Sequence, residues 1–165
     1  MASTRTIMGI DPGTARTGWG VIEAAGNKRR FLACGLISTP AGETPARRLR
    51  TLAEAVDGLL AEHRPDGVAL EKLFFAANAK TAIAVAEARG VILSACAGAS
   101  LEVAEYTPMQ VKQGVSGYGG ADKRQVGQMV ERLLGLKEAP KPDDVADALA
   151  IALCHGNRPL QFDRA

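Results

Sequence analysis

Apolar residues along this chain form short continuous runs that alternate with longer stretches of helical periodicity. The run 7–10 stops at Asp11-Pro12-Gly13, where proline removes a backbone donor and glycine permits a turn, which predicts a short strand. Residues 17–24 and 30–38 predict two further strands, and Gly26-Asn27-Lys28 between them is typical of a hairpin. The first part of the chain is therefore expected to form an antiparallel triplet of strands.

The rest of the pattern predicts helices that alternate with two more strands. Thr44 and Pro45 can cap and open a helix, and apolar residues then recur at helical spacing as far as Leu60. The short apolar runs 68–70 and 101–106 predict buried strands. Further helices are expected at 81–97, 108–113, 122–136 and 144–155, and a flexible glycine-rich loop at 114–120. This order predicts one α/β domain over residues 1–165, with a central mixed five-stranded sheet flanked by helices.

Composition narrows the class of protein. The 165 residues are 47% hydrophobic and 23% charged, which is too apolar for a disordered chain. Because the net charge is only +2, attraction to a polyanion depends on where the bases lie. The three cysteines include no Cys-x-x-Cys pair, so neither a disulfide framework nor a zinc site is indicated. Without an apolar run of membrane-spanning or signal-peptide length, we expect a cytoplasmic protein with no membrane partner.

Two acids follow apolar strands directly. Asp11 ends the first strand and Glu71 ends the run 68–70. In an open α/β sheet, functional groups gather beyond the carboxyl ends of the strands, so these carboxylates converge if their strands are neighbours. Either acid alone more commonly just begins a solvated turn, and the pair is the more informative observation.

The final helix supplies more acids. It is apolar on nearly all sides, so we expect it to be buried, and acids at its start are then not ordinary surface acids. Asp144 and Asp147 are three residues apart and Asp143 and Asp147 are four apart, so spacing alone does not choose between the first two. An alternative makes Asp143 an N-cap and Asp144 a partner of the helix dipole. That alternative explains Asp147, a full turn into the helix, poorly.

Four converging carboxylates would repel one another, and divalent cations would remove that cost. Oxygen ligands without cysteine or histidine suit Mg²⁺ or Mn²⁺ better than Zn²⁺. Two such ions, roughly 3.5 to 4 Å apart, form the usual clamp for attack of water on a phosphodiester. The acids therefore favour a metal-dependent hydrolase that acts on phosphodiester bonds.

Five motifs in order along the chain resemble the RuvC family of Holliday-junction resolvases. They are Gly-Ile-Asp-Pro-Gly-Thr at 9–14, Thr-Gly-Trp-Gly-Val at 17–21, Leu-Glu-Lys-Leu-Phe-Phe-Ala-Ala-Asn at 70–78, Gln-Val-Lys-Gln at 110–113 and Asp-Val-Ala-Asp-Ala-Leu-Ala-Ile-Ala at 144–152. The resemblance implies a ribonuclease-H-like fold and a homodimer that incises opposed strands of a four-way DNA junction in recombination and repair. It also implies two Mg²⁺ ions per active site, with Mn²⁺ able to substitute, and association with the branch-migration proteins RuvA and RuvB.

The resemblance also assigns residues. The family's metal-binding catalytic acids fall on Asp11, Glu71, Asp144 and Asp147, which selects Asp144 over its neighbour Asp143. Two family lysines near the active centre match Lys112 and Lys123, which could hold the scissile phosphate or stabilise developing charge.

Further residues are candidates for DNA contact. The aromatic that the family places against a junction base matches Phe74, whose alternative role is to continue the core. The full set of expected DNA-binding residues is Phe74, Asn78, Lys80, Arg89, Lys112, Lys123 and Arg124. Two basic clusters, at 28–30 and 47–50, could also follow the DNA arms, although such clusters are usually solvated faces.

Other interpretations stay open at this point. A sugar-kinase or actin-type ATP-binding domain also begins with an acidic glycine turn, but such proteins need two related domains. A junction-binding scaffold without catalysis is a second alternative, which the presence of all four matched acids disfavours. The alanine-rich helix 81–97 could be a dimer face or could be buried in the protein's own core.

Overall fold

The computed structural model describes residues 3–73 and 79–158, so Phe74 and Asn78 lie outside the described part of the chain. The strands are β1 (Thr4–Asp11), β2 (Arg16–Ala25), β3 (Lys28–Ser38), β4 (Gly67–Glu71) and β5 (Val103–Tyr106). The helices are α1 (Pro45–His63), α2 (Ala79–Gly98), α3 (Pro108–Ser116), α4 (Lys123–Leu134) and α5 (Asp143–Gly156).

The five strands form one mixed sheet in the order β3-β2-β1-β4-β5. β1, β2 and β3 pair antiparallel, as the hairpin at Gly26-Asn27 predicted, while β4 runs parallel to β1 and β5 runs parallel to β4. The expected antiparallel triplet and mixed five-stranded sheet are confirmed. β1 and β4 are neighbours, which is the condition for Asp11 and Glu71 to meet.

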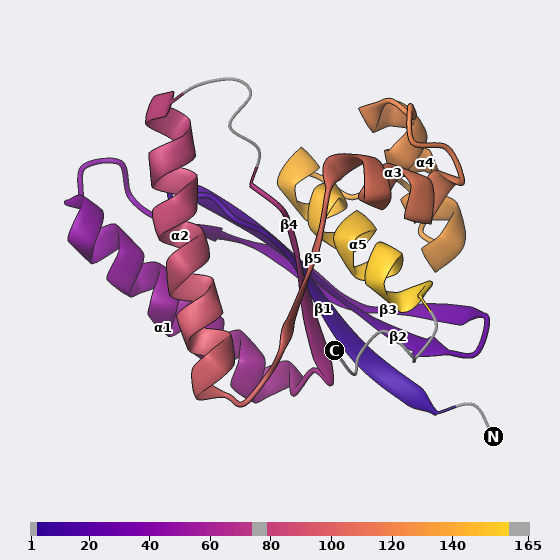
Figure 1. Cartoon of the computed structure of the whole chain (residues 1–165), viewed down its shortest axis with the longest axis horizontal. Coiled ribbons are helices and arrows are strands. Elements are labelled where there is room, and N and C mark those ends of the chain that lie inside the picture. The colour runs from indigo at the N-terminus through magenta and orange to yellow at the C-terminus, as the bar shows by residue number, and fades with distance from the viewer. Residues whose placement is uncertain (1–2, 74–78, 159–165) are drawn as a thin grey trace.

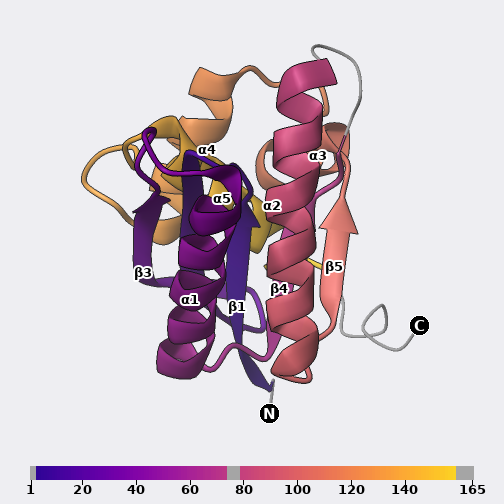
Figure 2. The ribbon, with the colours of Figure 1, turned by 90° about the vertical axis from the view of Figure 1, so that its left-hand side faces the viewer.

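Helices cover both faces of the sheet. α1 and α2 lie side by side on one face, and α5 lies on the other face with α3 and α4 around it (Figure 1). Figure 2 looks onto the first of these faces, with α1 and α2 in front of the strands. One buried cluster lies on each side, so the sheet separates two hydrophobic cores.

Helix α5 forms the centre of its layer. Its residues are buried from Ala148 to Gly156, which confirms the expectation for a helix that is apolar on nearly all sides. It lies directly on glycines of the strands: a Cβ at Gly9 would be 2.1 Å from the backbone oxygen of Ala148, and one at Gly20 would be 2.5 Å from the side chain of Leu149. Glycine at these positions lets the helix backbone approach the sheet.

The ends of the helices agree with their capping residues in most cases. Thr44 caps α1 with Pro45 at the first position, and Asp122 caps α4 through a reciprocal pair with Gln125. The alternative in which Asp143 is the N-cap of the last helix is not what the structure shows. Pro142 occupies that position without any side-chain cap, and Asp143 is the first residue of the helix.

The predicted glycine-rich loop 114–120 was also partly wrong. Helix α3 continues through Gly114 to Ser116 and ends at Gly117, which has a φ of 74°. A Cβ at Gly114 would lie 2.9 Å from the sulfur of Cys154, so α3 packs closely on α5 there. Tertiary packing therefore overrides the low helix propensity of glycine. At the end of the helix, Ser116 Oγ donates to the Lys112 carbonyl and accepts from the Tyr118 N–H, which orders the turn that follows.

Helix α2 is buried on one side only. Ala88, Ile92 and Cys96 enter the core at helical spacing, while Ile83 is 62% exposed. Among the described helices it alone is long and apolar enough to cross a membrane, by length and composition, and 22% of that stretch is buried in the monomer. A core helix of a soluble protein meets the same criteria of length and composition.

Candidate active site

The site begins where two parallel strands end side by side. Ile10 of β1 pairs with Leu70 of β4, so the next residues, Asp11 and Glu71, leave the same edge of the sheet together. Both acids are partly buried. The convergence predicted from the ends of the apolar strands is present.

Helix α5 adds acids at this edge. Asp11 pairs with Gly18 on β2, and a Cβ at Gly18 would lie 2.0 Å from the backbone oxygen of Asp144. The glycine therefore brings the first turn of α5 directly beside Asp11. Asp147 follows one turn later on the helix, and both its carboxylate and that of Asp144 are partly exposed.

The carboxylates lie close enough together to shift one another's pKa values. The pKa of Asp11 is raised from 3.8 to about 7. Burial is the largest cause, followed by repulsion from Asp147, Glu71 and Asp144, while Lys123 acts in the opposite direction. Asp11 would therefore be largely protonated below neutral pH in the metal-free protein.

The pKa values of Glu71 and Asp147 are raised as well. Burial is again the largest cause for both, and repulsion from Asp147 adds to the shift at Glu71. Lys112 and Lys123 partly offset the shift at Glu71, which places both lysines near the acids. Asp143 repels Asp147 and is itself exposed, whereas the repulsion on Asp11 from this turn comes from Asp144. The structure thus favours Asp144 over Asp143 as the inward acid.

Two basic side chains pair with Asp144 and Asp147 of α5. Lys123 Nζ lies 3.3 Å from Asp147 Oδ2, and the pKa of Lys123 is raised chiefly by its attraction to Asp147. Arg16 Nη2 lies 2.9 Å from Asp144 Oδ2. The sequence interpretation missed Arg16, although its place at the start of β2, five residues after Asp11, could have indicated it.

The donor set fits a hard divalent cation, since it consists of carboxylate oxygens with no cysteine or histidine. As the side chains stand, no three of the described histidine, cysteine, aspartate and glutamate residues are grouped tightly enough to hold an ion. Arg16 and Lys123 instead pair with one carboxylate oxygen each of Asp144 and Asp147, so a metal ion would compete with these ion pairs for the two acids.

Comparison with known proteins identifies the family. The family model for crossover junction endodeoxyribonuclease RuvC matches residues 7–155. This chain belongs to the RuvC family. The RuvC of Moorella thermoacetica is 55% identical over 151 residues, which cover 92% of this chain and 90% of that protein.

Solved structures agree with the family match. The Thermus thermophilus RuvC structure has a TM-score of 0.86 and 41% identity, and the match covers 92% of this chain and 93% of that one. T. thermophilus RuvC in complex with a Holliday junction substrate gives a TM-score of 0.87 at the same identity, over 92% of both chains. The ribonuclease-H-like fold implied by the sequence resemblance is therefore confirmed.

A groove leads away from the acids of this RuvC-family chain between α4 and α5. It measures about 490 Å³, and its lining includes Lys123, Arg124 and Asp147. Lys112, one helix away on α3, is partly exposed. These three bases border the acids, as a site for a phosphodiester requires, and their role in DNA binding stays a prediction.

The other expected DNA-binding residues differ in their surroundings. Lys80 is exposed at the start of α2. Arg89, in contrast, is only 13% exposed and is bound within the protein, where it donates 2.8 Å to the Glu71 carbonyl and pairs with the Glu105 carboxylate. DNA contact by Lys80 and Arg89 stays a prediction, as it does for Phe74 and Asn78, which lie outside the described residues.

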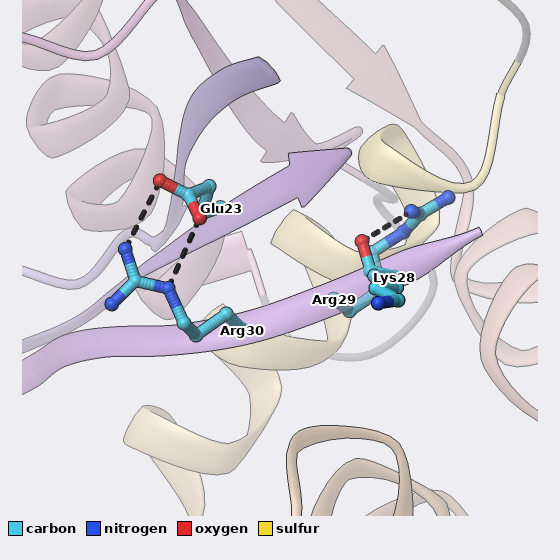
Figure 3. Close-up of polar contacts among 4 residues, drawn as sticks. All are labelled: Glu23, Lys28, Arg29 and Arg30. Atoms are coloured by element: carbon cyan, nitrogen blue, oxygen red, sulfur yellow. Dashed lines mark hydrogen bonds and ion pairs between the residues drawn. The ribbon is translucent and has the colours of Figure 1, made fainter. Parts of the chain in front are cut away.

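The basic cluster 28–30 lies at the far end of the β2–β3 hairpin, and two of its members have internal partners. Arg30 makes two hydrogen bonds, of 3.0 and 3.1 Å, to the Glu23 carboxylate on the neighbouring strand (Figure 3). Arg29 donates to the backbone carbonyl of Lys28, as the figure also shows. It donates as well to the carbonyl of Gly156 at the end of α5. These contacts stabilise the hairpin against α5, away from the carboxyl edge of the sheet.

Proposed function

We propose that this protein is a structure-selective endonuclease that resolves Holliday junctions by metal-dependent hydrolysis of phosphodiester bonds. A single nuclease domain over residues 1–165 makes one of two paired, symmetric nicks in opposed strands during homologous recombination and DNA repair. The observation that carries the proposal is the convergence of Asp11, Glu71, Asp144 and Asp147 at one edge of the sheet. Membership of the RuvC family supports it.

RuvC nucleases depend on metal, and we propose that two Mg²⁺ ions, replaceable by Mn²⁺, bind the four acids. When bound, such ions activate water and stabilise the leaving oxygen of the phosphodiester. Burial and mutual repulsion make Asp11 and Glu71 costly as free anions, which favours binding of a cation between them. Lys112 and Lys123 flank the acids, and their charges can hold the scissile phosphate.

We further propose a homodimer formed through α2. Two symmetric cuts require two sites related by a two-fold axis. The outer side of α2 is exposed at Ile83, Gly90 and Ser94, which share one face at helical spacing. An adjoining apolar groove of about 580 Å³ lies between α1 and α2. A second copy that covered this surface would bury it and place the two acidic sites on one assembly.

The family also suggests the cellular setting. We propose that the enzyme acts in the cytoplasm on four-way junctions delivered by RuvA and RuvB. Phe74 is expected to stack on a junction base, and Asn78, Lys80, Lys112, Lys123 and Arg124 to contact the backbone.

Cleavage of a synthetic junction tests the proposed activity. The purified protein should nick a four-way junction in pairs with Mg²⁺ or Mn²⁺, and should leave a matched linear duplex and all EDTA controls uncut. Asp11→Asn should retain junction binding and lose more than about 100-fold in cleavage, because even residues behind metal ligands commonly contribute 10- to 100-fold. Asp143→Asn, a change of the same kind at the exposed neighbouring acid, should keep most activity.

The outcomes separate the alternatives. Tight junction binding without any metal-dependent cut would support a scaffold, and specific ATP binding would support the kinase-type fold instead. Equal loss of binding and cleavage in folded Asp11→Asn would contradict the metal role of Asp11.

A further inference from the structure

Arg89 of helix α2 reaches the end of strand β4, directly behind the acidic site. Its Nη1 donates 2.8 Å to the backbone carbonyl of Glu71, and its Nη2 pairs with the carboxylate of Glu105 on β5. The Arg89 side chain is 13% exposed, and that of Glu105 is 33% exposed. One arginine thus joins α2, β4 and β5 at a single point.

The sheet register explains how this contact relates to the site. Glu105 pairs with Leu70, so the two side chains share the face of the sheet that α1 and α2 cover. Glu71 is the next residue after Leu70, and its side chain therefore points to the opposite face, toward α5. Arg89 holds the backbone of Glu71 from behind, while the Glu71 carboxylate lies close enough to Asp147 for repulsion to raise its pKa.

The Glu71 carbonyl needs a donor of this kind. Lys72 N–H donates 2.7 Å to the Tyr106 carbonyl, so the pairing of β4 with β5 continues past Glu71. On the other side, β1 ends at Asp11 and the chain continues into Pro12, which has no backbone N–H to offer. The Arg89 guanidinium supplies the hydrogen bond at the point where the regular ladder stops.

We propose that Arg89, oriented by Glu105, is a positioning residue that fixes the Glu71 carboxylate for metal binding. This inference rests on the proposed function, in which Glu71 is a metal ligand. It replaces the direct DNA contact that the sequence suggested for Arg89. The Arg89 guanidinium is partly buried, donates to the Glu71 carbonyl and pairs with the Glu105 carboxylate. Breaking both contacts to reach a phosphate would be costly, and the guanidinium exposes little surface to the phosphate.

Metal binding in the absence of DNA tests this role without relying on activity. Mn²⁺ is titrated into the full-length protein and followed by calorimetry or by electron paramagnetic resonance. Arg89→Met, which keeps an unbranched apolar stem at this position and removes the guanidinium donors, should weaken Mn²⁺ binding by about 10-fold or more. Glu105→Gln should shift binding less in the same direction, and Arg89→Lys should fall between Arg89→Met and the unchanged protein.

Junction binding in EDTA provides the second measurement. It should change less than about two-fold in Arg89→Met and Glu105→Gln, because neither residue is expected to touch DNA. Arg30→Met and Glu23→Gln are matched controls, since they break a cross-strand arginine–glutamate pair far from the acids (Figure 3). Both controls should leave Mn²⁺ binding unchanged.

Other results would overturn the proposal in distinguishable ways. Weaker junction binding with unchanged Mn²⁺ affinity in Arg89→Met would make Arg89 a DNA contact. A fall in melting temperature with unchanged Mn²⁺ affinity would make the pair merely structural. Glu71→Gln serves as the reference: if it also leaves Mn²⁺ binding unchanged, the metal site itself is misassigned, and the proposed function fails together with this inference.

Discussion

Helices α2 and α5 are both apolar along most of their length, yet the fold places them in opposite environments. In α5, ten of the fourteen residues are buried between the sheet and the helices α3 and α4. In α2, only 22% of the apolar stretch is buried. Apolar composition therefore does not decide burial by itself, and the surface that faces each helix must account for the difference.

Glycines show what that difference is. Beneath α5, a Cβ at Gly9, Gly18 or Gly20 would come within 2.5 Å of atoms of the helix, so these strands provide a smooth surface for its backbone. On α2, a Cβ at Gly90 or Gly98 would meet nothing within 4 Å. The strand surface at Gly9, Gly18 and Gly20 is covered by α5 of the same chain. The helix surface at Gly90 and Gly98 has no such neighbour among the described residues, which suits the close approach of another chain.

The largest expected effect comes from adding a methyl group to the strand surface on which α5 packs. In Gly9→Ala, the added methyl group would lie 2.1 Å from the Ala148 oxygen and 2.6 Å from the Ala152 nitrogen. Backbone atoms cannot rotate away, so we expect a loss of more than about 3 kcal/mol in the free energy of unfolding, at or beyond the usual cost of overpacking. Urea unfolding followed by circular dichroism measures it. Gly42→Ala, where a Cβ meets nothing within 4 Å, is the matched control. Native stability in Gly9→Ala would refute the close packing of α5.

The sequence predicted much of this region because local and tertiary preferences agree there. The all-round apolar pattern of α5 indicated burial, and the acids at strand ends indicated where Asp11 and Glu71 would meet. Those expectations needed only the alternation of strands and helices and the rule that sites form at carboxyl edges.

The pattern of apolar and polar residues did not predict contacts between residues that are far apart in sequence. Gly114 was assigned to a loop because glycine disfavours helices, whereas its contact with Cys154 keeps it helical. Arg16 was overlooked and the internal partner of Arg89 was not foreseen, because the ion pairs with Asp144 and Glu105 join residues far apart in sequence. Spacing along one element cannot reveal such partners.

Disrupting the open side of α2 should have the next largest effect. Ser94 is exposed and lines the groove between α1 and α2. Ser94→Arg would place a charge in the proposed dimer interface and should weaken self-association by about 100-fold or more, measured by analytical ultracentrifugation. The monomer should keep its melting temperature, and junctions should receive single rather than paired nicks. Gln113→Arg, an exposed position on α3, is the control. An unchanged dimer in Ser94→Arg would place the interface elsewhere.

The acids that meet at the edge of the sheet should make the free energy of unfolding fall, rather than rise, as pH increases from about 4 to 7. Asp11 has a folded pKa of about 7 against 3.8 in the unfolded chain, so between these values the folded state binds more protons. The free energy of unfolding should therefore fall as pH rises from about 4 to 7, by at least ~1 kcal/mol, since one pKa unit corresponds to ~1.4 kcal/mol. Thermal unfolding without metal, from pH 5 to pH 8, measures this trend.

Two comparisons sharpen the pH prediction. Asp11→Asn should be more stable than the natural chain at pH 8 and should lose most of the pH dependence. Mg²⁺ should raise the melting temperature more at pH 8 than at pH 5, because protons compete with the metal for the same oxygens. If the free energy of unfolding instead rises steadily from pH 5 to pH 7 without metal, the pKa of Asp11 is not raised by burial and by the neighbouring acids.

The smallest expected effect comes from Gly90→Ala, a substitution on the exposed side of α2 that should stabilise the monomer. Because a Cβ at Gly90 would meet nothing within 4 Å, Gly90→Ala should stabilise the monomer by roughly 0.5–1 kcal/mol, the usual gain from replacing glycine inside a helix. The measurement is best made in the Ser94→Arg background, where self-association no longer contributes. In the otherwise natural chain, the same methyl group should weaken the dimer if two α2 helices meet at Gly90. Stabilisation of the monomer together with a weaker dimer would therefore show that glycine is kept there for contact between subunits, whereas a gain in both would assign the contact to a different face of the helix.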